Sequence, residues 1–180
     1  VPKTSGISED LLAYVAASTS QPIENTGSVF EEDVTEFKQG NSIYNNGDLG
    51  IDLTSLFGVS PNDATDSDTG ANDLLNYPQN FQVSISGSNT QVDYDLDVPA
   101  GSYRIEFFAN TTADPSTHGE GETFIFSQNV VSAGSGAQPY SAIIPGNSYT
   151  NISSTATEIT ASSTGFGSTS EFSAPQGPVT

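Results

Sequence analysis

The chain has 180 residues, of which 22 are acidic and 3 are basic, so its formal net charge is -19. This length suits one domain of ordinary size or two small ones, and it is sufficient to bury a core. Three positive side chains cannot form the basic patch that nucleic acids and anionic membrane surfaces require, so we expect neither as a partner. The absence of cysteine excludes disulfides, thiol catalysis and cysteine-ligated metals. No apolar run is long enough to cross a bilayer, and we expect no membrane insertion.

The composition favours an extracellular location. The chain contains 26 Ser and 19 Thr, with little Lys. Such a composition is typical of secreted or surface-exposed β proteins. The sequence starts at Val1 rather than Met and shows no signal peptide, so we expect a processed, mature chain.

Residues 1–25 predict an N-terminal extension with a short helix. Ser8 can cap a helix that runs to Ala17, and Glu9 and Asp10 then lie in its first turn, where the helix dipole favours negative charge. Ten residues are too few for a stable isolated helix. We therefore expect its apolar face to dock on another part of the protein.

Residues 26–80 combine short apolar pieces with Gly, Asn and acidic residues, a pattern that predicts a chain turning every few residues. The segment ends in a polar loop in which six side chains with oxygen ligands fall within twelve residues: Asn62, Asp63, Asp66, Asp68, Asn72 and Asp73. Oxygen ligands at alternating spacing, followed by Gly70, suit Ca²⁺. We predict a calcium site here, and the alternative is a solvated loop of Asx turns.

Residues 81–175 alternate apolar and polar side chains, as half-buried strands do. The predicted strands are residues 81–85, 92–98, 103–107, 124–126, 130–131, 140–144, 152–161 and 168–174. About seven strands at this spacing predict an all-β fold, an Ig-like β-sandwich, and leave residues 176–180 as a tail. Asp93, Asp95 and Asp97 share one face of a strand, which predicts a solvated face, contact with a cation or protection against edge pairing.

Two further groups of residues are candidate sites. Asp114, Glu120 and Glu122, near the single His118, suit a second metal site, a carboxylate pair for glycoside hydrolysis or a solvated loop. The sequence provides no cleft with aromatic platforms for sugars, so we expect no enzyme. Asn110 and Asn151 match the N-glycosylation acceptor pattern, and each also arises by chance in so Ser- and Thr-rich a chain.

Segments 40–53 and 61–78, followed by 99–110, 114–124 and 170–174, resemble a junction found in large secreted proteins. There the closing coil of a right-handed parallel β-helix leads into an Ig-like module. The resemblance implies a single solenoid-like coil before the sandwich, and it implies no activity. Related modules carry a cysteine in the places of Ala113 and Pro175, and this chain lacks both. A lone coil needs a cover, because solenoid coils bury their faces on neighbours.

These observations predict an extracellular structural protein, a self-assembling subunit of a filament, sheath or surface layer. Its partner is itself, and bound Ca²⁺ offsets the repulsion between acidic copies. One alternative is a calcium-dependent adhesin or carbohydrate-binding module with glycans as partners. The other is a carboxylate-pair hydrolase.

Overall fold

The computed structural model describes residues 40–54, 58–160 and 165–178. Within these ranges the fold is all-β, with seven strands and one 3-10 turn, η1 (Ala71–Leu74). The expected all-β class is confirmed. The N-terminal extension and its helix lie outside the described residues.

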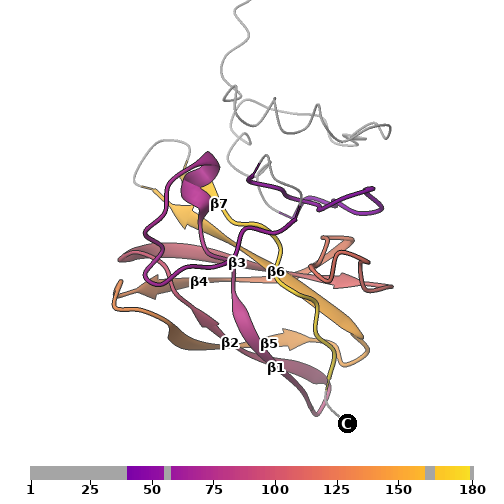
Figure 1. The fold of residues 1–180 in the computed structure, drawn as a ribbon. Helices are drawn as coiled ribbons and strands as arrows, with labels where there is room; N and C mark the ends of the chain where they lie inside the picture. The colour runs from indigo at the N-terminus through magenta and orange to yellow at the C-terminus, as the bar shows by residue number, and fades with distance from the viewer. Residues whose placement is uncertain (1–39, 55–57, 161–164, 179–180) are drawn as a thin grey trace, which may run out of the picture.

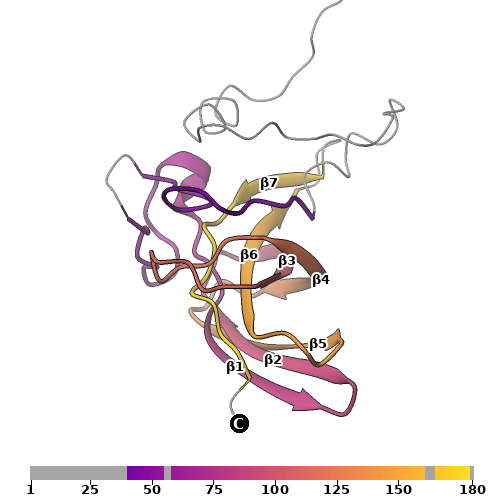
Figure 2. The ribbon, with the colours of Figure 1, turned by 90° about the vertical axis from the view of Figure 1, so that its right-hand side faces the viewer.

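The strands form two antiparallel sheets that lie one above the other (Figures 1 and 2). The three-stranded sheet has the order β1 (Gln79–Ser86), β2 (Asn89–Leu96) and β5 (Gln138–Pro145). The four-stranded sheet has the order β4 (Thr123–Ser132), β3 (Gly101–Asn110), β6 (Asn151–Ile159) and β7 (Phe166–Thr169).

The strands follow from the alternation in the sequence. In β2, Val92, Tyr94 and Leu96 point into the molecule, while Asp93 and Asp95 point outward. The β1–β2 hairpin closes through a two-residue loop whose Gly87 has φ 64, a conformation that glycine adopts without steric cost.

The predicted strands were wrong in two places. The pieces expected at 124–126 and 130–131 are parts of the single strand β4. The last strand ends at Thr169 instead of continuing to residue 174. Beyond it, the hydroxyls of Ser170 and Ser173 accept hydrogen bonds from the backbone of β6, at Ala156 and Ser154. The N–H groups of the same two serines donate to the carbonyls of Ala156 and Ser154, so serine side chains and backbone together hold this segment along β6.

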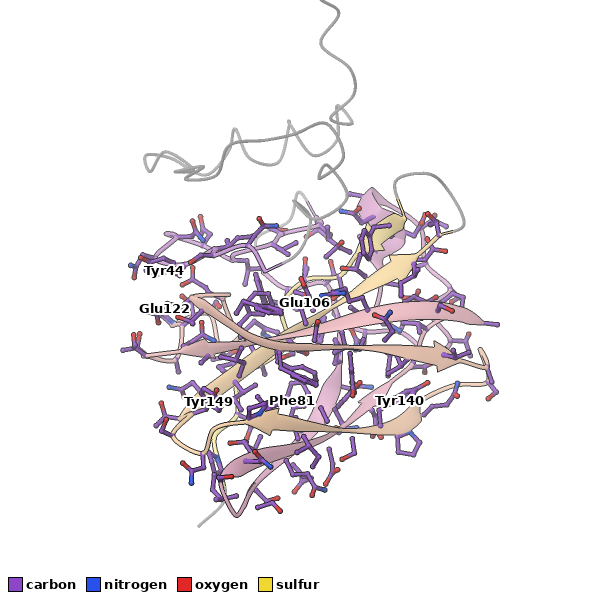
Figure 3. All side chains as sticks on the ribbon, turned by 180° about the vertical axis from the view of Figure 1, so that it is seen from behind. Tyr44, Phe81, Glu106, Glu122, Tyr140 and Tyr149 are labelled. Atoms are coloured by element: carbon purple, nitrogen blue, oxygen red, sulfur yellow. The ribbon has the colours of Figure 1, made fainter. Side chains whose placement is uncertain are left out.

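The main core lies between the two sheets. Figure 3 shows Phe81 in this interior. Phe107 is fully buried, and its ring contacts those of Tyr94 and Phe126 at centroid distances of 5.7 and 6.3 Å. Burying each such side chain stabilises the fold by about 1.5–3 kcal/mol.

A second apolar layer lies on the outer face of the four-stranded sheet. Phe108 and Phe172 are each 3% exposed, with ring centroids 5.4 Å apart. The segments 40–54 and 58–77, here called the cover, lie on the side of the molecule where β6 and β7 are found (Figure 2). A Cβ on Gly50 of the cover would lie 3.0 Å from the Phe172 ring, which shows how closely the backbone approaches. The sheet is therefore buried on both faces where the cover meets it.

Candidate functional site

The polar loop brings three of the six predicted calcium ligands together. One carboxylate oxygen from each of Asp63, Asp66 and Asp68 lies within 4.8 Å of the other two. No basic side chain within the described ranges offsets them, because Arg104 is the single Lys or Arg there and it lies 3.4 Å from Glu106. Three carboxylates so close together form a group of oxygen atoms suited to a hard cation.

The loop is fastened by amide side chains that act as backbone partners. Nδ2 of buried Asn76 donates to the carbonyl oxygens of Asp63 and Asp97, and its Oδ1 accepts from the Asp63 backbone. Asn62 bonds both the N–H and the carbonyl of Tyr77. These bonds hold the two ends of the loop together, so the carboxylates between them have a defined arrangement.

The loop backbone is strained at several positions. Thr65 and Asp66 have φ values of 65° and 53°, and Asn72, Asp73 and Leu74 follow with 47°, 55° and 52°. Residues other than glycine rarely adopt this left-handed conformation, and it persists only where the surroundings fix it. The hydrogen bonds of Asn62 and Asn76 supply that constraint.

The other three predicted ligands have different surroundings. Asn62 directs both polar groups of its side chain to Tyr77. Asp73 accepts a hydrogen bond from Ser168 of β7 at 2.9 Å and is not part of the carboxylate group. Asn72 is exposed in η1, and its carbonyl accepts from Leu75. The structure therefore narrows the candidate site to the three aspartates.

Asp97, which directly follows β2, is a further candidate that the sequence placed only in the acidic stripe with Asp93 and Asp95. Its Oδ1 is enclosed and has no hydrogen-bond partner. Its charge also contributes to raising the pKa of Asp66, so the two carboxylates lie near each other. The other members of the stripe have neighbours: Asp93 accepts from Gln91, and Asp95 accepts from Asn80.

Burial and neighbouring charges change the titration of the site. Burial, aided by the charges of Asp63, Asp68 and Asp97, raises the pKa of Asp66 to about 6. The pKa of Asp63 is lowered instead, because Ser67 donates hydrogen bonds to its carboxylate. The N–H of Asn76 also donates to Asp66 Oδ1 at 2.7 Å, which opposes the rise in its pKa without cancelling it.

The second predicted group does not converge on one point. Glu120 accepts hydrogen bonds from the backbone N–H groups of Asn45 and Asn46 at 2.9 and 3.0 Å. Glu122 accepts from the N–H and hydroxyl of Thr111, and Asp114 accepts from the N–H of Ser116. Each carboxylate thus fastens a different stretch of backbone.

Two glutamates of the sandwich that the sequence did not single out have the same role as Glu120. Glu171 is 1% exposed and accepts from the N–H groups of Leu53 and Ser60. Glu106, labelled in Figure 3, accepts from the N–H of Gly40 and is 5% exposed. Burial raises the pKa of both groups. Glu106, Glu120 and Glu171 together attach the cover to the sandwich.

The two glycosylation candidates differ in accessibility. Asn110 is 7% exposed, and its Nδ2 donates to Ser153 at 2.9 Å. A glycan on that nitrogen requires this bond to break and the site to open, so the fold disfavours it. Asn151 is half-buried at the start of β6, and its glycosylation stays a prediction.

A cavity of about 260 Å³ lies beside Glu120. Its lining includes Asn45, Asn46 and Asp114, together with Ala113 and Pro175. The single histidine lies elsewhere, with its ring edge-on to Tyr77 at a centroid distance of 5.4 Å. Burial lowers the pKa of His118, which favours its neutral form.

Neither known protein-family models nor curated proteins match this sequence. Within the described part of the chain, no helix is long and apolar enough to cross a membrane. The geometry of the site and the fold therefore carry the functional argument.

Proposed function

We propose that this protein is an extracellular structural subunit that assembles with copies of itself and is stabilised by Ca²⁺. The observation that carries the proposal is the meeting of Asp63, Asp66 and Asp68 within 4.8 Å, without a neutralising basic side chain among the described residues. The enclosed Oδ1 of Asp97 supports the same reading, since a bound cation would give it a partner.

Calcium and assembly are linked through charge. A net charge of -19 opposes close contact between copies. A divalent cation held in the loop reduces that charge, and it also fixes the strained backbone at Asp66. We therefore propose that the calcium-bound form is both more stable and more prone to assemble than the calcium-free form.

The resemblance to secreted Ig-like modules supports the extracellular part of the proposal. The groupings β1-β2-β5 and β3-β6-β7 match those of three strands in each sheet of an immunoglobulin domain, while β4 lies beside β3 rather than β5. Tyr149 precedes β6, and its hydroxyl donates to the carbonyl of Pro145 at 2.7 Å, as in a tyrosine corner. Ala113 and Pro175, which replace the paired cysteines of related modules, line one cavity. We propose an Ig-like sandwich whose cover corresponds to the solenoid-like coil.

Sedimentation and calorimetry test the calcium proposal. We expect large, regular particles with Ca²⁺ and their loss after chelation. At a calcium concentration of 100 times the dissociation constant, the free energy of unfolding rises by about 2.7 kcal/mol. Asp66→Asn with Asp68→Asn should abolish the binding heat, whereas Asp114→Asn with Asp95→Asn makes the same charge change elsewhere and should leave it intact. Equal binding by both double variants would overturn the assigned site.

A carbohydrate-binding module is the second candidate, and the cavity beside Glu120 is the observation that favours it. Amide and carboxylate groups line this cavity and can bond sugar hydroxyls. A monomer that is retained on immobilised glycan, and released by Asp114→Ala, would establish this function in place of assembly. We propose no hydrolase, because Glu120 and Glu122 are each engaged with backbone groups.

A further inference from the structure

Within the seven described strands, charged side chains occur only on the central strands of the two sheets. Asp93 and Asp95 lie on β2, Arg104 and Glu106 on β3, and Glu158 on β6. The edge strands β1, β4, β5 and β7 contain no Asp, Glu, Lys or Arg. This is the reverse of the usual pattern, in which charges on edge strands prevent pairing with other chains.

Three of the four edges are protected in other ways. β5 contains Pro139 and Pro145, β7 has four residues, and the register of β1 shifts between Gln79 and Gln82. Proline, short length and bulges all hinder strand addition. β4 has ten residues without Pro or Gly, and its stretch from Phe126 to Ser132 pairs with β3 in unbroken register. β4 is therefore the least protected edge.

The backbone of β4 offers hydrogen-bonding groups at this edge. The hydroxyl of Tyr140, on β5, donates to the carbonyl of Val131 at 2.9 Å, so this carbonyl points away from β3. In an antiparallel ladder the N–H and carbonyl of one residue point to the same side, and alternate residues share that side. The backbone groups of Ser127 and Asn129 thus also point away from β3, to the side on which no described strand pairs with β4.

We propose that β4 of one copy pairs antiparallel with β4 of a second copy, joining two four-stranded sheets into one. The middle residue of the regular stretch is Asn129, which faces itself across the two-fold axis, while Ser127 faces Val131. The Val131 side chain is 73% exposed in the single chain and gains a neighbour in the pair. The Val131 carbonyl has two lone pairs, so it can accept from the second copy as well as from Tyr140.

Charge argues for a second copy as the occupant. Another copy carries the same charge of -19, so it can approach most closely where neither surface is charged. The residues of β4 are uncharged along its whole length, and a self-paired strand presents the same residues on both sides. The charge that reaches β4 is the Arg104 guanidinium, which donates to the Ser127 hydroxyl at 2.7 Å and is opposite in sign to the net charge of a second copy. This inference rests on the proposed self-assembly and assigns it a surface.

Cysteine cross-linking tests the pairing directly, because the chain contains no cysteine. Residues that exchange backbone hydrogen bonds across an antiparallel pair have Cα atoms about 5.5 Å apart, a distance that a disulfide spans. Asn129→Cys should therefore give a disulfide-linked dimer under mild oxidation with diamide. Asn147→Cys, in the exposed β5–β6 loop, is the matched control. We expect the first variant to cross-link at least about tenfold faster, because pairing raises the effective thiol concentration.

The wild-type particle mass, measured by sedimentation over a range of protein concentrations with Ca²⁺, separates the two proposals. Assembly together with fast, selective cross-linking at residue 129 supports both. Assembly with equal cross-linking rates for the two variants overturns the β4 interface and leaves self-assembly in place. A monomer at every concentration, with slow cross-linking of both variants, overturns both proposals.

Discussion

The interior of the sandwich and its cover are held by different interactions. Between the sheets, ladders of backbone hydrogen bonds surround apolar side chains such as Phe107. Among the described residues of the cover, the β-type pairing is a single isolated bridge, between Ile43 and Gly121. Glutamate carboxylates and asparagine amides satisfy much of its remaining backbone. An acidic composition therefore does not mean that every carboxylate is a surface charge, because several here serve as backbone acceptors.

The largest expected difference between the sandwich interior and the cover is in the free energy of unfolding that is lost when one phenylalanine of each region is truncated. Phe107→Ala removes a fully buried ring between the sheets, and we expect a loss of about 4 kcal/mol in the free energy of unfolding. Phe172→Ala removes one ring of the outer layer, where the cover can move toward the sheet and fill the space, so its cost should be smaller. Urea unfolding measures both values. An equal loss, with a single cooperative transition, would mean that the cover and sandwich are one unit.

Substitution of Glu171 tests whether its carboxylate takes the place of a neighbouring strand as hydrogen-bond acceptor for the backbone of the cover. Glu171→Ala leaves the N–H groups of Leu53 and Ser60 without their acceptor, which costs about 2 kcal/mol. Glu171→Gln retains one acceptor oxygen and should cost less. Hydrogen exchange is the sharper measurement, because the amides of Leu53 and Ser60 should lose protection while those of β3 keep theirs. Loss of protection throughout β3 would contradict a role confined to the cover.

Calcium binding by the polar loop should depend on pH, because Asp66 titrates in the range in which binding can be measured. Because the pKa of Asp66 is raised to about 6, the folded metal-free protein takes up a proton there more readily than the unfolded chain does. The contribution of Asp66 to stability is therefore most favourable at low pH and is lost as the pH rises through 6. Calcium must displace this proton, so its affinity should rise about tenfold between pH 5 and pH 7.

Isothermal titration at several pH values measures this affinity, and Asp66→Asn is the control. The variant has no titrating group at position 66, so its weaker binding should vary much less with pH. A wild-type affinity that is constant from pH 5 to pH 7 would contradict the displacement of a proton from Asp66 by calcium.

The sequence predicted the sandwich better than the cover, for a physical reason. Alternation of apolar and polar residues is a local signal, and it located strands such as β2 and β5 within a few residues. The cover depends on hydrogen bonds between residues far apart in the chain, such as Glu171 and Leu53. No local pattern marks such a pair, and a glutamate between a serine and a phenylalanine gives no sign of being buried. The spacing of the aspartates did single out the loop as a candidate metal site. Only the fold shows that Asp66 lies in the group of three carboxylates and that Asp73 bonds Ser168 instead.

The smallest expected effect concerns two tyrosine hydroxyls of the sandwich, and it tests whether polar side chains also stabilise that part of the protein. The hydroxyls of Tyr149 and Tyr103 each donate to the carbonyl four residues earlier, at Pro145 and Pro99, at 2.7 and 3.1 Å. Each bond fixes the path of the chain as it passes from one sheet to the other. Tyr149→Phe removes the hydroxyl and keeps the ring, so we expect a loss of about 1 kcal/mol. Tyr103→Phe should cost more, because Tyr103 is 3% exposed and burial raises the pKa of its hydroxyl to about 12, whereas Tyr149 is only half-buried. Urea unfolding of both variants gives the order, and a larger cost at Tyr149 would place the main constraint on the sandwich at the β5–β6 corner.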